Sequence, residues 1–250
     1  MSVKVFVLGC PGTGKSTVVR HLLDLAEHNS YHATRMKDYH ILLDMFQKET
    51  LQDKFRESQY GGFRVLDPSI YDMALKQLEI DVEEKEAHAS SQEILTIEFA
   101  RTNYRDAFHK FSPSFLENAY FFFLDAGVKT CIERIHNRLT VPPVSDCHFV
   151  PDEVVRAYDD TDNWSYVTQD FKKEFTLQKE VVFYSNTGTL DALYSEVERF
   201  ANIIFTNEFS QPGQKDVTSP KELQVSLSQT SSVGEASFLP HPTEKAMAIL

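Results

Sequence analysis

The chain has 250 residues, of which 42% are hydrophobic and 25% are charged, and its net charge is -12 at pH 7. This composition is that of a folded globular protein and excludes a chain that is disordered or fibrous throughout. The acidic balance argues against nucleic-acid binding in bulk and against binding to an anionic membrane.

The sequence gives no indication of a membrane segment, a disulfide framework or a zinc site. Its longest apolar runs are far shorter than a bilayer span and its first residues lack the pattern of a signal peptide, so we expect a cytoplasmic protein. Cys10, Cys131 and Cys147 are odd in number, widely spaced and without a C-x-x-C pair.

Strand and helix patterns alternate through the first part of the chain. Short β-branched and aromatic runs predict strands, and apolar residues three and four positions apart predict helices. In chain order we expect a strand over residues 3–8, a helix over 16–27, a short extended stretch near 31–35, a helix over 38–46, a turn over 60–63, a long helix over 68–89 and a strand over 93–99.

The alternation continues until the composition changes near residue 206. We expect a strand over residues 119–124, a helix over 127–138, a loop over 140–152, short helices over 152–159 and 164–175, a strand over 181–185 and a helix over 190–205. The strand over 119–124 is nearly all apolar, which predicts a central place in the sheet. The whole order predicts an α/β fold with a parallel, five-stranded sheet covered on both faces. Residues 206–250 are dominated by Gln, Ser, Thr and Pro and are predicted to be a disordered tail.

The strongest motif follows the first predicted strand. Residues 9–16 read GCPGTGKS, which fits the phosphate-binding loop G-x-x-x-x-G-K-S/T between a strand and a helix. Glycines let backbone N–H groups converge on phosphate oxygens, the Lys15 ammonium reaches the β- and γ-phosphates, and the Ser16 hydroxyl can bind Mg²⁺. We therefore expect ATP and Mg²⁺ as cofactors. The residues expected to bind the nucleotide are Gly9, Cys10, Pro11, Gly12, Thr13, Gly14, Lys15, Ser16 and Thr17.

Three classes of protein share this loop, and the rest of the sequence favours one of them. A switch GTPase would carry N-K-x-D after a later strand, and no such string occurs. A mechanical ATPase would end an apolar strand in an acidic pair, whereas the strand over 93–99 ends in Glu98, followed by Arg101. The chain is also too short for a helicase or AAA lid domain. A small-molecule kinase with the three-layer fold of a P-loop NTPase and a helical lid remains.

The loop, the chain length and the order of elements resemble the nucleoside monophosphate kinase-like group, which includes adenylate, thymidylate and deoxynucleoside kinases. Glu98 and Arg101 look like the acid–arginine pair of that group, in which the two residues are adjacent. The resemblance implies a kinase domain over residues 1–205, with an acceptor-binding insert at about 36–90 and a lid at about 134–163.

The same resemblance implies roles for residues in the second half of the chain. Arg134 and Arg138 lie four residues apart, on one face of a helix, and would neutralise phosphate charge, or would only solvate a surface helix. The loop over residues 185–188 would hold the adenine base, or would be a plain strand-to-helix turn. Trp164 is expected to be a packing anchor where the lid returns to the core.

Phosphoryl transfer to a hydroxyl group requires a base or an orienting carboxylate at the carboxyl edge of the sheet. We expect Glu98 to orient the acceptor, paired with Arg101 or with hydrated Mg²⁺, or to form a structural ion pair. We expect Asp125 to bind Mg²⁺ through water, or to cap the helix that starts near Gly127. The metal candidates are Ser16 and Asp125. The catalytic candidates are Lys15, Glu98, Arg101, Arg134 and Arg138.

Two clusters, residues 35–39 and 60–67, are candidates for acceptor binding. Tyr39 and Phe63 could stack on a base or pack in the core. Residues 146–153 contain Asp, Cys and His in no zinc spacing, which favours lid closure or a helix cap.

The leading hypothesis is an enzyme, a kinase that transfers the γ-phosphoryl group of Mg·ATP to a small acceptor, a nucleoside or a nucleotide. One alternative is a regulatory ATPase that acts with a protein partner, for which the tail would be a tether. The other is a polynucleotide-end kinase with a local basic channel. The sequence specifies neither the acceptor nor the oligomeric state.

Overall fold

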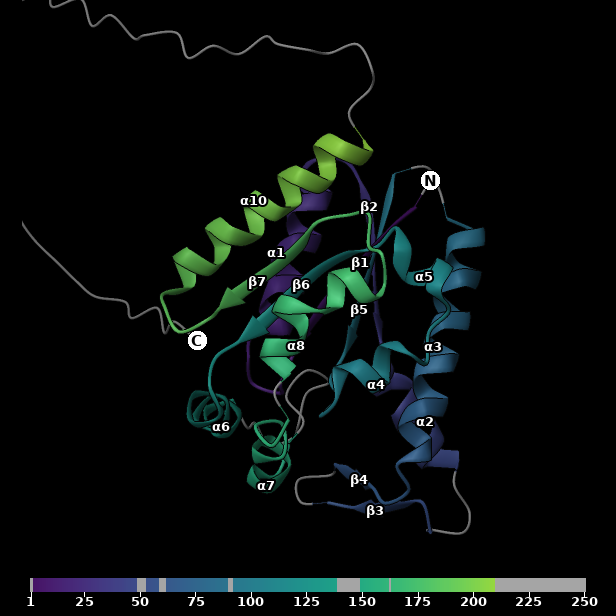
Figure 1. Cartoon of the computed structure of the whole chain (residues 1–250), viewed down its shortest axis with the longest axis vertical. Helices are drawn as coiled ribbons and strands as arrows, with labels where there is room; N and C mark the ends of the chain where they lie inside the picture. The colour runs from purple at the N-terminus through teal and green to yellow at the C-terminus, as the bar shows by residue number, and fades with distance from the viewer. Residues whose placement is uncertain are drawn as a thin grey trace, which may run out of the picture. The chain divides into compact units, whose positions relative to one another are not determined.

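The computed structural model describes residues 2–48, 53–58, 62–89, 92–138, 149–161 and 163–209 (Figure 1). All of these residues belong to the unit formed by residues 1–210. Of the loop predicted over residues 140–152, residues 140–148 lie outside the described part of the chain. The predicted tail also lies outside it, except for residues 206–209, most of which continue the last helix.

The main sheet has five parallel strands in the order β2-β5-β1-β6-β7. These strands are β1 (Ser2–Gly9), β2 (His32–Lys37), β5 (Glu93–Phe99), β6 (Tyr120–Asp125) and β7 (Val181–Ser185). β-Branched and aromatic residues dominate most of them because such side chains pack well on a pleated surface. The predicted parallel, five-stranded sheet is confirmed. β1 occupies its middle, and the apolar β6 lies directly beside it.

Helices connect these strands. Among the described residues they are α1 (Lys15–His28), α2 (Asp38–Lys48), α3 (Ser69–Ala87), α4 (Tyr104–Phe108), α5 (Pro113–Glu117), α6 (Val128–Asn137), α7 (Asp152–Arg156), α8 (Asn163–Gln169), α9 (Phe171–Glu174) and α10 (Leu190–Glu208). None of these helices is long and apolar enough to cross a membrane.

Successive side chains of each strand point to opposite faces of the sheet, and both faces are covered. On β6, Tyr120 and Phe122 pack in the cluster that contains α1 and α10, whereas Phe121 and Phe123 pack in the cluster of α3, α4, α5, α8 and α9. Figure 1 shows α1 and α10 together on one side of the sheet and α3 and α5 on the other. The result is the predicted α/β sandwich of three layers.

A smaller apolar cluster joins α2, α3 and a two-stranded hairpin, β3 (Phe55–Glu57) and β4 (Phe63–Val65). Sequence analysis did not predict this hairpin because three residues are too few to show an alternating pattern. The predicted turn over residues 60–63 is only partly described, and Phe63 already belongs to β4.

Several element boundaries differ from the prediction. Helices α4 and α5 were missed because each has only five residues, fewer than two helical turns. The helix predicted over residues 164–175 is two helices, because α8 ends at Gln169 and Asp170 is the N-cap of α9. Helix α7 ends at Arg156, and α10 continues beyond the predicted end to Glu208.

The strand order creates a switch point between β1 and β6. The connection that leaves β1 leads to β2 on one side of the sheet, and the connection that leaves β6 leads to β7 on the other. In parallel α/β sheets such a divergence leaves a crevice outside the carboxyl ends of the two strands, where ligands bind. Gly9 and Asp125 end these two strands and therefore border this crevice.

Candidate active site

The phosphate-binding loop leaves β1 at Gly9 and enters α1 at Lys15. Gly12 and Gly14 have φ angles of 90° and 103°, in the left-handed region that favours glycine. A Cβ atom on Gly12 would lie 2.5 Å from the carbonyl oxygen of Cys131. Glycine at this position therefore serves both the loop conformation and its close approach to α6.

We expect Gly12→Ala to abolish ATP binding, because the new methyl group would displace the loop from α6. Gly127→Ala is the matched control: Gly127 also has a positive φ, 67°, but a Cβ atom there meets nothing within 4 Å. Isothermal titration calorimetry with ATP should show binding only in the control variant. Equal affinity in the two variants would contradict this account of the loop.

The Lys15 side chain reaches back over the loop. Its Nζ donates to the carbonyl oxygens of Gly9, at 2.7 Å, and Cys10, at 2.9 Å. Burial lowers the pKa of Lys15. The Cys10 thiol and the Glu98 carboxylate raise this pKa, and the positive charge of Arg138 lowers it further. A desolvated ammonium group with a second cation beside it is suited to binding phosphate oxygens.

Two buried polar side chains, Tyr104 and Asn186, form hydrogen bonds with the backbone of the loop. Tyr104, at the start of α4, accepts a hydrogen bond from the backbone N–H of Gly9 at 2.8 Å. Asn186, after β7, donates from Nδ2 to the carbonyl oxygen of Thr13 at 2.8 Å. Sequence analysis missed both contacts, because they join segments far apart in the chain. Adenine binding by residues 185–188 stays a prediction.

The loop also contacts α6 through two cysteines. The side chains of Cys10 and Cys131 form a hydrogen bond. This bond and burial both raise the pKa of the Cys10 thiol, whereas the same bond lowers the pKa of the Cys131 thiol. Both cysteines are free thiols. Helix α6 is thus anchored directly to the phosphate-binding loop.

The oxygen donors expected for Mg²⁺ are Ser16, in the first turn of α1, and Asp125, at the end of β6. Among the described residues no three His, Cys, Asp or Glu side chains cluster as a metal site. This donor set fits Mg²⁺, which keeps several waters and binds through one or two protein oxygens and the substrate phosphates. Asp125 Oδ1 also accepts from the N–H of Gly127 at 3.3 Å, but Gly127 is itself the N-cap of α6, which has no side-chain capping hydrogen bond.

Glu98 pairs with an arginine other than the expected Arg101. Glu98 forms a short ion pair with Arg35 of the neighbouring strand β2, and it is only 5% exposed. In the parallel register Lys37 faces Glu98, so Arg35, two residues before Lys37, projects from the same side of the sheet. Arg101 lies three residues beyond Glu98, after the end of β5, and it pairs with a different residue.

Arg101 is paired instead with Asp38, the first residue of α2. The two side chains, each 10% exposed, are joined by a 2.5 Å contact between Nη1 and Oδ2. Arg101 also donates to the carbonyl oxygens of Ala100, at 2.7 Å, and Tyr71, at 3.1 Å. Its Nε is buried and has no hydrogen-bond partner among the described residues. The pair ties α2 and α3 to the carboxyl edge of β5.

We expect Asp38→Asn to lower the free energy of unfolding by about 3–5 kcal/mol, because it leaves the buried Arg101 without its counter-charge. Asp44→Asn, in the same helix, is the control: its ion pair with Lys48 has side chains that are 57% and 75% exposed, so little stability should be lost. Urea unfolding measures both. Similar losses in the two variants would contradict this assessment of the buried pair.

The two arginines of the predicted lid helix lie at the C-terminal end of α6. Arg134 donates from Nη2 to the carbonyl oxygen of Asn186 at 2.9 Å, and its Nη1 is buried without a partner among the described residues. Arg138 is the C-cap of α6, and its charge acts on Lys15. Both guanidinium groups are thus near the phosphate-binding loop, and an unsatisfied N–H on Arg134 fits a ligand that is bound there.

A cavity of about 230 Å³ opens at the switch point, beside the phosphate-binding loop. Gly9 and Cys10 border it from the loop, and Asp125 borders it from the end of β6. The other residues that line it are Tyr104, Phe123, Leu124, Tyr158, Asp159, Thr161, Asn163, Trp164 and Val167. Sequence analysis did not predict this cavity, because its walls come from separate segments. The Trp164 ring meets the Phe183 ring edge-on, with centroids 6.1 Å apart, and also lines the cavity, so its role as a packing anchor stays a prediction.

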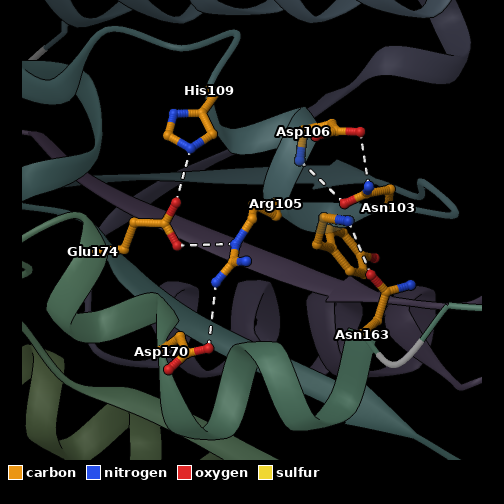
Figure 2. Close-up of polar contacts among 8 residues, drawn as sticks. Asn103, Arg105, Asp106, His109, Asn163, Asp170 and Glu174 are labelled. Atoms are coloured by element: carbon orange, nitrogen blue, oxygen red, sulfur yellow. Dashed lines mark hydrogen bonds and ion pairs between the residues drawn. The ribbon is translucent and has the colours of Figure 1, made fainter.

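A polar network fixes one wall of this cavity (Figure 2). Arg105 of α4 binds Glu174 and Asp170, at 3.2 Å and 3.3 Å, and His109 reaches Glu174 at 2.8 Å. Asn163, at the start of α8, accepts from the backbone N–H of Tyr104 at 2.9 Å. These contacts dock α4 on α8 and α9 and so hold Tyr104 and Asn163 in place.

The predicted acceptor clusters and lid are only partly described. Tyr39 and Phe63 stack on each other, with ring centroids 5.7 Å apart, which supports the packing alternative for these two residues. In the predicted lid, His136 contacts Asp152 at 2.8 Å, and residues 146–148 lie outside the described part of the chain. The insert and lid boundaries, and the domain end at residue 205, stay predictions.

No protein-family model matches the chain, and the curated proteins yield no match. Three similar solved structures are kinases. A sugar kinase from Janibacter sp. HTCC2649 is 15% identical over 81% of this chain and 96% of its own, with a TM-score of 0.48. A shikimate kinase from Acinetobacter baumannii, in complex with shikimate, is 11% identical over 84% and 97%, with a TM-score of 0.46. A gluconokinase from Sinorhizobium meliloti 1021 is 16% identical over 82% and 97%, with a TM-score of 0.40. At these values the similarity does not extend to substrates or individual residues.

Proposed function

We propose that the chain is a kinase that transfers the γ-phosphoryl group of Mg·ATP to a hydroxyl group of a small molecule, a nucleoside or a nucleotide. One observation carries this proposal: the phosphate-binding loop forms part of the wall of the cavity at the switch point. Gly9 and Cys10 belong to the loop and also line the cavity, next to Asp125. A second ligand in that cavity would lie beside the donor phosphates, which phosphoryl transfer requires and simple hydrolysis does not.

The donor side of the proposed site is built from the loop and α6. The backbone N–H groups of residues 12–16 would cradle the phosphates, and the macrodipole of α1 would favour their charge. Lys15, Arg134 and Arg138 would stabilise the negative charge that develops during transfer. Ser16 and Asp125 would hold Mg²⁺, which would offset the negative charge of the phosphates.

On the acceptor side, the hydroxyl oxygen would form a bond to the γ-phosphorus while the bond from that phosphorus to the β–γ bridging oxygen breaks. ADP would leave with the electron pair of the broken bond. The hydroxyl proton would pass to a carboxylate at the carboxyl edge of the sheet, either Glu98 or Asp125, which lines the cavity, and from there to water. Arg101 would contribute to the transfer either by donating from its buried Nε or by positioning Asp38 through their ion pair.

The test is ADP release from Mg·ATP against a panel of nucleosides, nucleotides, sugars and oligonucleotide ends, with products identified by mass. We expect one acceptor to gain the mass of a phosphoryl group and to accelerate ADP release. Slow hydrolysis across the whole panel would contradict the kinase and favour the regulatory ATPase. A phosphorylated oligonucleotide end would favour the polynucleotide kinase.

A further inference from the structure

Where the structure describes them, the charged side chains on the walls of the cavity beside the phosphate-binding loop are acidic. Among the described residues that line it there is no lysine, arginine or histidine, whereas Asp125 and Asp159 both face it. A negatively charged acceptor would therefore lose its hydration and gain no counter-charge.

Three cations of the site, Arg101, Arg35 and Lys15, do not line this cavity. Arg101 acts electrostatically on Tyr104 and Tyr158, but its charge is matched by Asp38 at 2.5 Å. Arg35 is likewise paired with Glu98. Lys15 lies on the donor side, where its Nζ is held by two carbonyl oxygens of the loop. The charges of both arginines are thus matched by carboxylates, and the charge of Lys15 is assigned to the donor phosphates.

The walls of the cavity instead suit a ring that carries hydroxyl groups. Tyr104, Tyr158 and Trp164 provide aromatic surface, on which a base or the C–H face of a sugar can pack. Asp159 and Thr161 add oxygen atoms that can bond to hydroxyl groups. The volume of about 230 Å³ is below the range of roughly 300–1,000 Å³ that is usual for drug-sized ligands, so a compound of one or two rings fits.

We propose that this cavity binds an uncharged, ring-containing hydroxyl compound as the acceptor and discriminates against its phosphorylated or carboxylated counterpart. The inference rests on the proposed function and narrows it: within the nucleoside or nucleotide class, it selects the nucleoside. A neutral sugar has the same chemistry, and the experiment separates the two.

The chain contains its own reporter for this cavity. Trp164 is the only tryptophan in the sequence, and it is 38% exposed. Its fluorescence can be titrated in the absence of ATP with two matched pairs: a nucleoside and its 5′-monophosphate, and a neutral hexose and its aldonate. Inorganic phosphate is added as a control for non-specific anion binding. Because no turnover is needed, the Lys15→Ala variant can be titrated in the same way.

We expect the neutral member of one pair to change the fluorescence with an affinity at least about 10-fold higher than that of its anionic counterpart. The pair that responds identifies the compound as a nucleoside or a sugar. Equal binding of the two members, tighter binding of the anion or no response to either pair would overturn the inference.

Two substitutions locate the discrimination. Asp159→Asn removes a charge from the wall and should reduce the preference for the neutral compound several-fold. Asp160→Asn, one residue further along, changes a side chain that does not line the cavity, so it should leave the preference unchanged. Equal effects of the two would place the discrimination elsewhere and overturn the inference.

Failure of this inference is distinguishable from failure of the proposed function. Phosphorylation of a nucleotide or a sugar acid, but of no neutral compound, would overturn the inference and leave the kinase intact. Tight binding of a neutral compound that ATP never phosphorylates would overturn the kinase and leave the binding site.

Discussion

Replacement of Lys15 by alanine is expected to lower acceptor-dependent turnover at least about 100-fold in a protein that stays folded, in line with the loss of one preorganised donor at a developing charge. Among the described residues the Lys15 ammonium bonds only to the carbonyl oxygens of Gly9 and Cys10, so its removal breaks no contact outside the phosphate-binding loop. What is lost is a desolvated positive charge at the position where the β- and γ-phosphates would lie.

Lys129→Ala is the matched control for this variant. Lys129 lies in the first turn of a helix next to the site, α6, as Lys15 lies in the first turn of α1, but its side chain is 91% exposed. Turnover is measured as ADP release with acceptor, and nucleotide binding by equilibrium dialysis with labelled ATP. If Lys15→Ala turned over as fast as Lys129→Ala, the loop would not be the donor site.

What the sequence predicted well is local in origin. The motif over residues 9–16 specifies a strand, a glycine-rich turn and a helix within a few positions, so both the loop and its flanking elements were predictable. Four of the five strands were predictable because each is a short run with strong β preference, whereas β2, which reads HATRMK, was predicted only as a short extended stretch. The short helices α4 and α5 and the β3–β4 hairpin were not, since too few residues carry their pattern.

The contacts that build the site are long-range, which explains why they were missed. Glu98 and Arg35 are 63 residues apart, and they meet only because β2 pairs with β5 in a particular register. Tyr104 and Asn186 support the loop from positions 95 and 173 residues away. Residue type suggested which carboxylate and which arginines to consider, but only strand order and register determine which of them meet.

The largest effect on the chemical step is expected from Glu98→Gln. We predict intact ATP binding with kcat reduced about 10²–10⁴-fold, the usual contribution of a general base. The substitution also removes the partner of Arg35, so the variant should lose stability, and a loss of activity alone would be ambiguous.

Glu93→Gln resolves this ambiguity. Glu93 begins the same strand, is 4% exposed against 5% for Glu98, and is held by Lys85 at 3.2 Å and by the Thr34 hydroxyl at 2.7 Å. Both substitutions remove a buried, paired carboxylate from β5, but Glu93 lies at the opposite end of the strand from the phosphate-binding loop. Each variant is assayed at a temperature at which circular dichroism shows it to be folded. Loss of kcat in Glu98→Gln alone would establish a role for this carboxylate in transfer, because the two variants share the structural defect. Equal activity in the two variants would leave Glu98 with only the role of a structural ion pair. The proton of the acceptor hydroxyl would then have to pass to another carboxylate at the site, and Asp125 lines the cavity.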